Sequence, residues 1–279
     1  MKVVLIGANG QLGSDICRTK PDGIEFIPLR KTDLDITDRD KQREVFMRIN
    51  PQVVINTAAY HKTDECEDNP ELSFRVNAIA VRDMANICNE LGAVLMHIST
   101  DYVFDGNNKN HLYTEGDIPN PINTYGASKY AGEIFIRNSL TRYYIARTAS
   151  LYGKAGASGK GGNFVYTMLK KGREGAALKV IDDMFMSPTY TADAAKQIWK
   201  IISEKLPYGI YHITNSGYCS WYEFAKKILE TAGLKNEIIP VSHIEYKTKA
   251  RRPLWSPLAT AKDIKMRKWE EALKDFIAN

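Results

Sequence analysis

Two side chains that could move a proton lie four residues apart in the segment Tyr125-Gly126-Ala127-Ser128-Lys129. Residues at this spacing project from the same face of a helix, so the phenol of Tyr125 and the ammonium of Lys129 are expected to be neighbours. A nearby cation lowers the pKa of a tyrosine from about 10 and makes the phenol a usable acid at neutral pH. The pair therefore predicts general-acid chemistry.

Spacing alone does not single out this pair, because two later pairs share it: Tyr166 with Lys170, and Tyr222 with Lys226. Only Tyr125 follows shortly after the fourth predicted strand, at 94–98, which leads directly into Ser99 and Thr100. Ligands bind at the carboxyl ends of strands in open α/β sheets. A hydroxyl from Ser99 or Thr100 is then expected to hold a substrate carbonyl oxygen near Tyr125. We interpret the two later pairs as surface or packing residues.

A glycine-rich turn, Gly7-Ala8-Asn9-Gly10-Gln11-Leu12-Gly13, directly follows the apolar run at 2–6. Between a strand and a helix, such a turn lets a pyrophosphate approach the helix N-terminus closely, which predicts dinucleotide binding. The spacing is GxxGxxG rather than GxGxxG, and this variant resembles the short-chain dehydrogenase/reductase superfamily. Asn56 to Tyr60, after the third predicted strand, supplies small residues where backbone packs against a cofactor.

The second predicted strand ends in Leu29-Arg30-Lys31, where an NAD-selective protein usually has an acid. Arg30 and Lys31 could bind a ribose 2′-phosphate, which would favour NADPH over NADH. They could equally be exposed loop cations. The sequence leaves both interpretations open.

Strands and helices alternate over the first half of the chain. Apolar or β-branched runs predict buried parallel strands at 2–6, 24–29, 53–57, 94–98 and 143–148, with helices between them at 38–49 and 71–91. This alternation predicts an α/β fold with a doubly wound parallel sheet, the Rossmann arrangement. We expect a dinucleotide-binding domain over 1–150 and a smaller substrate-binding lobe over 151–279, with some segments of the lobe returning to the first domain.

Composition narrows the class of protein further. The 279 residues carry a formal net charge of +5 and four scattered cysteines without a CxxC pair, which suits reduced thiols in the cytoplasm. The first apolar run is too short for a signal peptide or a membrane span. Basic residues cluster between 247 and 268; they could bind phosphates or form a solvated surface, and no motif accompanies them that would indicate nucleic-acid binding. The histidines show no HExxH pattern, so no catalytic zinc is predicted.

Motifs along nearly the whole chain are similar to those of the dTDP-4-dehydrorhamnose reductases, a family of extended short-chain dehydrogenase/reductases. They are GANGQLG from Gly7, LDITD from Leu34, NTAAY from Asn56, VNA from Val76, STDYVFDG from Ser99, YGASKYAGE from Tyr125, RTASLYG from Arg147, NFVYTMLK from Asn163, SPTYTAD from Ser187, GIYHITNSG from Gly209, SWYEFA from Ser220 and ARRPLWSPL from Ala250. The resemblance implies an oxidoreductase of nucleotide-sugar biosynthesis that uses NADPH or NADH to make a dTDP-linked 6-deoxysugar, usually dTDP-L-rhamnose.

The resemblance also implies roles for individual residues. Thr100, Tyr125 and Lys129 would be the catalytic trio. The cofactor would be bound by Gly7, Gly10, Gln11, Leu12, Gly13, Arg30, Asp35, Ile36, Ala58, Ala59, Tyr60, Asn77, Ser99, Tyr125 and Lys129. The substrate would be bound by Thr100, Asp101, Tyr102, Ser150, Asn163, Arg252 and Trp255.

Several positions depart from the family pattern. Ser150 stands where many members have a tryptophan near the sugar, Trp255 replaces a small polar residue, and Met186 replaces a frequent glycine. Ser150 and Trp255 together suggest that an aromatic wall has moved from one side of the sugar to the other. Some members bind Mg²⁺ at a dimer contact, and Asp15 could serve there, although we interpret it as an isolated acid on a helix surface. A magnesium site and a homodimer stay open without being predicted.

Two other functions compete with reduction. The regulatory subunit of methionine adenosyltransferase resembles the same reductases yet acts as a binding partner, and retention of Thr100, Tyr125 and Lys129 argues against it. An epimerase or dehydratase of the extended family is the other alternative. Such dehydratases tend to have an Asp-Glu pair after the catalytic serine or threonine, whereas Asp101-Tyr102 follows Thr100 here.

Overall fold

The computed structural model describes residues 1–156, 162–175 and 177–278. Its centre is a parallel six-stranded sheet with the strand order β10-β5-β4-β3-β1-β2. The strands are β1 (Lys2–Ile6), β2 (Glu25–Leu29), β3 (Val53–Asn56), β4 (Val94–Thr100), β5 (Tyr143–Thr148) and β10 (Gly209–His212). The predicted doubly wound α/β fold is therefore confirmed.

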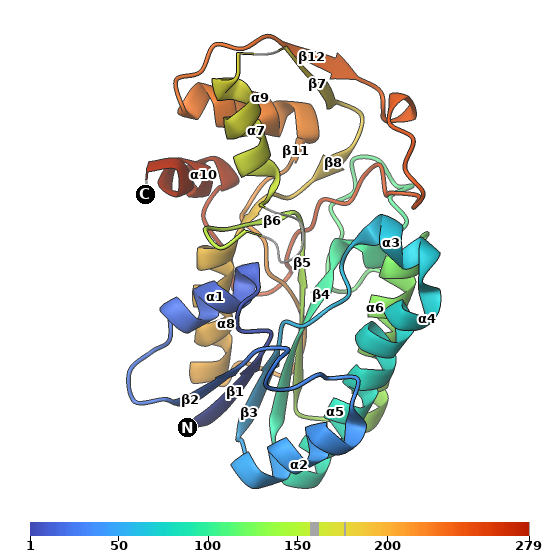
Figure 1. Ribbon diagram of the computed structural model, residues 1–279, viewed down its shortest axis with the longest axis vertical. Coiled ribbons are helices and arrows are strands. Elements are labelled where there is room, and N and C mark those ends of the chain that lie inside the picture. The colour runs from blue at the N-terminus through green and yellow to red at the C-terminus, as the bar shows by residue number, and fades with distance from the viewer. Residues whose placement is uncertain (157–161, 176, 279) are drawn as a thin grey trace.

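Helices cover both faces of the sheet (Figure 1). One face packs against α1 (Gln11–Arg18) and α8 (Thr191–Ser203), and the other against α2 (Arg39–Ile49), α5 (Ala80–Leu91) and α6 (Thr124–Ser139). The side chains of β1 show why two layers form: Val3 and Leu5 enter one core, while Val4 and Ile6 enter the other. Alternate residues of a strand point to opposite faces, so a continuous apolar run needs cover on both sides.

The chain reverses its direction across the sheet between β1 and β3. From β1 it runs outward to β2 and then returns to β3 on the other side of β1. The carboxyl ends of β1 and β3 therefore flank the topological switch point, where open α/β sheets bind ligands.

A smaller group of elements lies over the carboxyl ends of the strands (Figure 1). Its short strand pairs are β6 (Leu151–Tyr152) with β9 (Thr189–Tyr190), β7 (Leu178–Ile181) with β12 (Ile238–Val241), and β8 (Phe185–Met186) with β11 (Cys219–Ser220). Its helices are α7 (Phe164–Arg173), α9 (Trp221–Thr231), η3 (His243–Glu245) and α10 (Trp269–Ala278). In the second half of the chain, α8 and β10 pack with the main sheet. A domain boundary at residue 150 stays a prediction.

The helix predicted over 71–91 is confirmed, with a π-helical turn inside it. The structure has α3 (Thr63–Asp68), α4 (Pro70–Phe74), a π-helical turn η1 (Arg75–Ile79) and then α5, which ends at Gly92 with a left-handed φ of 63°. A π turn inserts an extra residue into the helical repeat and often occurs at functional sites. Here it carries Val76, which lines the main cavity described below.

Candidate active site

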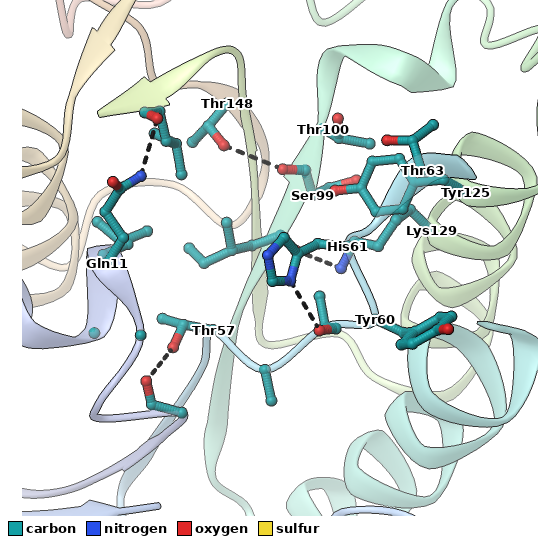
Figure 2. Close-up of a pocket in the computed structure, with 18 of the residues that line it drawn as sticks. Gln11, Thr57, Tyr60, His61, Thr63, Ser99, Thr100, Tyr125, Lys129 and Thr148 are labelled. Carbon is teal, nitrogen blue, oxygen red and sulfur yellow. Dashed lines mark hydrogen bonds between the residues drawn. The ribbon is translucent and has the colours of Figure 1, made fainter. Parts of the chain in front are cut away.

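A cavity of about 730 Å³ opens at the switch point of the sheet. Its walls come from the turn after β1, the segment after β3, the end of β4 with η2 (Asp101–Val103), and the start of α6. The lobe closes it with residues near β6, α7 and α9. Figure 2 shows Thr100, Tyr125 and Lys129 together on one side of the cavity and Gln11 on the other.

The turn between β1 and α1 fits the pyrophosphate of a dinucleotide. A Cβ atom on Gly13 would lie 2.2 Å from the carbonyl oxygen of Gly7, so only glycine allows the helix to start this close to the strand. The N-cap residue, Gly10, makes no side-chain hydrogen bond to the helix. The unpaired N–H groups at the start of α1 can therefore bind an anion.

Tyr125 is held in place by a close contact between α6 and η2. A Cβ atom on Gly126 would lie 2.1 Å from the carbonyl oxygen of Tyr102, and the helix is capped by Asn123, whose Oδ1 accepts from the Gly126 N–H at 2.8 Å. Loss of hydration at the Tyr125 phenol raises its pKa above the ordinary value, an effect that hydrogen bonding with Thr100 partly offsets. The phenol is thus a protonated group at neutral pH.

Lys129 is a buried residue of the cavity wall. Its side chain is 1% exposed, Nζ donates to the carbonyl oxygen of Ile98 at 2.6 Å, and it lies 2.9 Å from Nε2 of His97. Burial lowers the pKa of Lys129 to about 7. Without a cofactor the amine has lost its hydration and the pKa of Tyr125 is raised, so a lowering of the Tyr125 pKa by Lys129 stays a prediction for the protein with its cofactor bound.

The two candidate hydroxyls have different partners. Ser99 Oγ donates to Glu133 Oε1 at 2.5 Å, and Glu133 also forms a buried ion pair with Arg147 at 2.7 Å, so Ser99 is tied into the core. Thr100 Oγ1 donates to Asp101 Oδ1 at 3.1 Å and accepts from the Tyr102 N–H at 3.2 Å. Thr100 is also the hydroxyl whose hydrogen bonding acts on Tyr125. It is therefore the better placed of the two to hold a carbonyl oxygen.

Asp101 links this cluster to the C-terminal segment. Its side chain is buried, and Oδ2 accepts from Ser256 Oγ at 2.6 Å. Burial raises the pKa of Asp101 to about 6. Near Asp101 the cavity wall includes Arg252, whose Nη2 donates to Asp64 at 2.9 Å while its buried Nη1 has no partner among the described residues.

Comparisons with known proteins agree with this geometry. A family model described as the RmlD substrate binding domain matches residues 1–279. The spore coat polysaccharide biosynthesis protein SpsK of Bacillus subtilis is 40% identical over 99% of this chain and 96% of its own length. The crystal structure of dTDP-4-dehydrorhamnose reductase from Bacillus anthracis in complex with NADP is 41% identical, covers 99% of this chain and 98% of its own, and has a TM-score of 0.93. The chain belongs to the dTDP-4-dehydrorhamnose reductase family. A structure from Clostridium acetobutylicum, also described as such a reductase, is 41% identical and covers 100% of this chain and 99% of its own, with the same TM-score.

Membership of the dTDP-4-dehydrorhamnose reductase family confirms the resemblance drawn from the motifs and the prediction of an oxidoreductase. Most residues that the resemblance assigned to a site line the main cavity. These are Gly7, Gly10, Gln11, Leu12, Gly13, Asp35, Ile36, Ala58, Ala59, Tyr60, Ser99, Thr100, Asp101, Tyr102, Tyr125, Lys129, Ser150, Asn163 and Arg252. Arg30, Asn77 and Trp255 do not line it.

Asn77 acts one layer behind the cavity wall. It is fully buried, its Oδ1 accepts from the Tyr60 N–H at 2.9 Å, and its Nδ2 donates to the carbonyl oxygen of Tyr60 and to Ser128 Oγ. The prediction of a direct cofactor contact is wrong for Asn77, because all its polar atoms serve to fix the segment around Tyr60 against α6.

Arg30 and Lys31 separate in the structure. Lys31 lines the main cavity and lies 3.8 Å from Asp35, whereas the exposed Arg30 is not among the lining residues. The backbone N–H of Arg30 donates to Asp33 in a turn. Of the two cations, Lys31 is therefore the one that the structure places at the cavity wall.

The predicted aromatic wall at Trp255 is also wrong. Trp255 is 5% exposed, its Nε1 donates to the carbonyl oxygen of His111 at 2.6 Å, and its ring packs in a core cluster with Val103, Phe104 and Leu258. A ring whose surface and only donor are used inside the protein has nothing left for a sugar.

We expect Trp255→Ala to lower the free energy of unfolding by about 3–5 kcal/mol, because it opens a large cavity in this cluster. The KM for substrate should stay unchanged in the fraction that remains folded. Urea unfolding and steady-state kinetics on the same preparation check both statements. Trp221 provides the matched control, since it lines the cavity, and Trp221→Ala should raise KM instead. A higher KM for Trp255→Ala with normal stability would restore the aromatic-wall hypothesis.

The description of Asp15 as an isolated acid on a helix surface needs correction. Asp15 is 3% exposed and accepts from Thr191 Oγ1 at 2.5 Å and from Arg18 at 2.7 Å. The bond from Thr191 joins α1 to the start of α8, whereas Arg18 lies on α1 itself. Within the described ranges, no group of three or more potential metal ligands occurs.

A second cavity of about 710 Å³ lies beside the first, and sequence reasoning did not find it as a unit. The two cavities share Tyr102, Phe164, Trp221 and Arg252. Five cations line the second one, against a single acid, Asp105: they are Lys171, Lys179, Lys247, Arg251 and Arg252. In the sequence, the basic cluster near 247–252 was the only indication of this cavity. Lys171 and Lys179 lie too far from that cluster in the sequence to be grouped with it.

Proposed function

We propose that this chain reduces the 4-keto group of a nucleotide-linked 4-keto-6-deoxysugar, in the first place dTDP-4-dehydro-L-rhamnose to dTDP-L-rhamnose, with NADPH or NADH as reductant. The observation that carries the proposal is the junction of the two cavities. One is built around a dinucleotide turn, the other is basic, and Tyr102 and Arg252 belong to both. The membership of the reductase family and the NADP bound to the Bacillus anthracis relative support the same reaction.

The second cavity suits a nucleoside diphosphate. Its cations can pair with phosphate oxygens, and the apolar side chains of Val180, Met184 and Trp221 offer a surface for a base. Arg252 lines both cavities, and its buried Nη1 has no hydrogen-bond partner in the part of the chain that the structure describes. A sugar attached to the diphosphate would therefore extend past Arg252 toward Thr100 and Tyr125.

The proposed mechanism assigns each residue one task. The turn at Gly7 to Gly13 holds the dinucleotide, which supplies the hydride when bound. Thr100 holds the keto oxygen of the sugar. Tyr125 donates the phenolic proton to that oxygen, which becomes the hydroxyl of the product. Lys129, as an ammonium, would hydrogen-bond the nicotinamide ribose and stabilise the phenolate that Tyr125 leaves behind.

Lys31 is proposed to discriminate between the two reductants. Because its ammonium can pair with a 2′-phosphate, Lys31→Ala should lower the ratio of kcat/KM for NADPH to that for NADH, by about 3- to 10-fold at an exposed and screened site. Arg30→Ala is the matched control and should change the ratio less. A larger effect for Arg30 than for Lys31 would reverse the assignment.

Arg251 is proposed to bind the phosphates of the substrate. Arg251→Ala should raise the KM for the nucleotide sugar about tenfold, the loss expected when one charge-assisted hydrogen bond is removed. Lys249 is the control from the same segment: it does not line the cavity and pairs with Asp68 at 2.6 Å. Equal effects of Arg251→Ala and Lys249→Ala in steady-state kinetics would contradict a direct phosphate contact.

The alternatives differ from this proposal in what they consume. A regulatory relative would turn over no keto sugar, and an epimerase would interconvert sugars without net loss of NADPH. Absorbance at 340 nm with a panel of nucleotide 4-keto-6-deoxysugars tests the proposal. Consumption of NADPH with the dTDP-linked sugar supports the proposal. If no sugar led to NADPH consumption, the binding-partner function would be favoured instead.

We also propose the cellular location of the reaction. The described part of the chain has no helix long and apolar enough to cross a membrane. The scattered cysteines favour the reducing cytoplasm as the location. A homodimer stays open and is not part of the proposal.

A further inference from the structure

The surroundings of the Lys129 nitrogen suit an amine better than an ammonium. Nζ donates to the carbonyl oxygen of Ile98 at 2.6 Å and lies 2.9 Å from Nε2 of His97. Both side chains are almost fully buried. Either Lys129 Nζ or His97 Nε2 donates in this contact. The hydrogen bond at the other ring nitrogen of His97, Nδ1, decides which of them it is.

Asn56 decides which ring nitrogen of His97 carries the proton. Asn56 and His97 face each other on β3 and β4, with Nδ2 of the amide 3.1 Å from Nδ1 of the imidazole. The amide cannot turn round, because its Oδ1 accepts from the backbone N–H of Ala58 at 3.0 Å and a turn would set two donors against each other. Nδ1 must therefore accept, and the proton of a neutral His97 lies on Nε2.

A proton on His97 Nε2 requires a lone pair on Lys129. An ammonium has none, so it would face the N–H of the ring donor to donor. We propose that Asn56 and His97 hold Lys129 as an uncharged amine until a dinucleotide binds, and that Lys129 takes up a proton from solvent with that binding. This inference rests on the proposed function only for the identity of the ligand. It makes Asn56 and His97 positioning residues for the charge of Lys129.

The other charged groups around Lys129 do not oppose this state strongly. Glu133, one turn further along α6, is the acid that favours the charged form, but it is engaged by Arg147 of β5 and by Ser99 of β4. Tyr125 is a protonated phenol. Burial lowers the pKa of Lys129 to about 7 and that of His97 well below its ordinary range, so both are uncharged at pH 8.

Binding changes this balance because Lys129 also lines the main cavity. The hydroxyl oxygens of a bound ribose would be hydrogen-bond acceptors there. An ammonium on Lys129 would donate to these oxygens instead of facing His97. The step forms one N–H bond at Nζ and consumes one proton from solvent. The affinity for dinucleotide should therefore weaken as the pH rises above about 7, by up to tenfold per pH unit.

His212 provides an internal reference with the opposite tautomer. Its Nδ1 faces the carbonyl oxygens of Tyr113 at 3.0 Å and Ala259 at 2.8 Å, so Nδ1 must donate. Its Nε2 faces a cationic group, Arg147 Nη1, at 3.5 Å. In His212, Nε2 therefore accepts from a cation. His97 would need this same tautomer if Lys129 were charged.

The first test is the tautomer of His97 in the wild-type protein without ligand, which does not depend on any activity. Long-range ¹H–¹⁵N spectra of protein labelled with ¹⁵N-histidine at pH 8 should show His97 protonated at Nε2 and His212 protonated at Nδ1. The spectrum of His97→Gln serves to assign the His97 signals. A His97 protonated at Nδ1 would overturn the inference.

The second test counts protons. Calorimetric titration of NADPH at pH 8 in two buffers of different ionisation enthalpy should show uptake of about one proton per bound ligand. Asn56→Asp should reduce the uptake nearly to zero, because a carboxylate accepts from both Ala58 and His97 Nδ1 and leaves Nε2 free to accept from an ammonium already present. Binding by the wild type without proton uptake would contradict the inference. Failure of NADPH to bind would count against the proposed function, and the tautomer measurement would still decide the inference.

Discussion

Replacement of the Tyr125 phenol by a phenyl ring should lower kcat by about 10²- to 10⁴-fold, the usual contribution of a positioned general acid. Tyr125→Phe removes one oxygen atom from a ring that α6 and η2 hold in place, so the fold and the affinity for NADPH should stay nearly intact. The proposed mechanism places the effect on kcat, because the phenol would donate its proton to the reacting oxygen rather than bind a remote part of the substrate. Steady-state kinetics and calorimetric binding measure the two quantities separately.

The two other tyrosines with a lysine four residues later are the controls. Tyr166 donates to the carbonyl oxygen of Lys154, Tyr222 packs against the core of the lobe, and neither lines the main cavity. Tyr166→Phe and Tyr222→Phe should therefore turn over close to the wild-type rate. If Tyr125→Phe matched them, the proton would have to come from another group.

Gly10→Val should raise the Kd for NADPH by about 10²-fold, the loss expected when one or two hydrogen bonds to a charged phosphate are removed. Gly10 has φ −74° and ψ 168°, which valine adopts readily, and its Cβ would approach only the carbonyl oxygen of Gly7, at 3.2 Å. The substitution should thus leave a folded protein with a side chain where the pyrophosphate would lie. Calorimetry measures the affinity, and circular dichroism checks the fold.

Gly116→Val is the matched control, because Gly116 is exposed and a Cβ atom there would meet only Thr114 Oγ1, at 3.9 Å. Its affinity for NADPH should equal that of the wild type. A folded Gly10→Val protein with unaltered affinity would show that the dinucleotide does not use this turn.

Local patterns predicted the parts of the site that local structure builds. The turn from Gly7 to Gly13 and the pair of Tyr125 and Lys129 each lie within one strand–helix or helix segment, so their geometry follows from short-range spacing. The fold class followed from alternating apolar runs for the same reason. Position at the end of β4 then separated Tyr125 from the two other tyrosines.

Burial and partner choice could not be predicted in this way. Trp255 and Asp15 are buried because segments far away in the sequence pack over them. Asn77 does not line the cavity because its side chain is hydrogen-bonded to Tyr60 and Ser128. The charge of Lys129 likewise depends on His97 and Asn56, which lie on two other strands. Spacing within one helix carries no information about such contacts.

Transfer of deuterium from [4-²H]NADPH to the sugar tests the central claim most directly, because it follows the hydride to one carbon atom. With dTDP-4-dehydro-L-rhamnose and the deuterium on the transferred face of the nicotinamide, NMR of the product should show one deuterium at C4 and a new hydroxyl there. An unlabelled C4 in a sugar that has nonetheless been converted, or no conversion by the folded protein, would contradict the account.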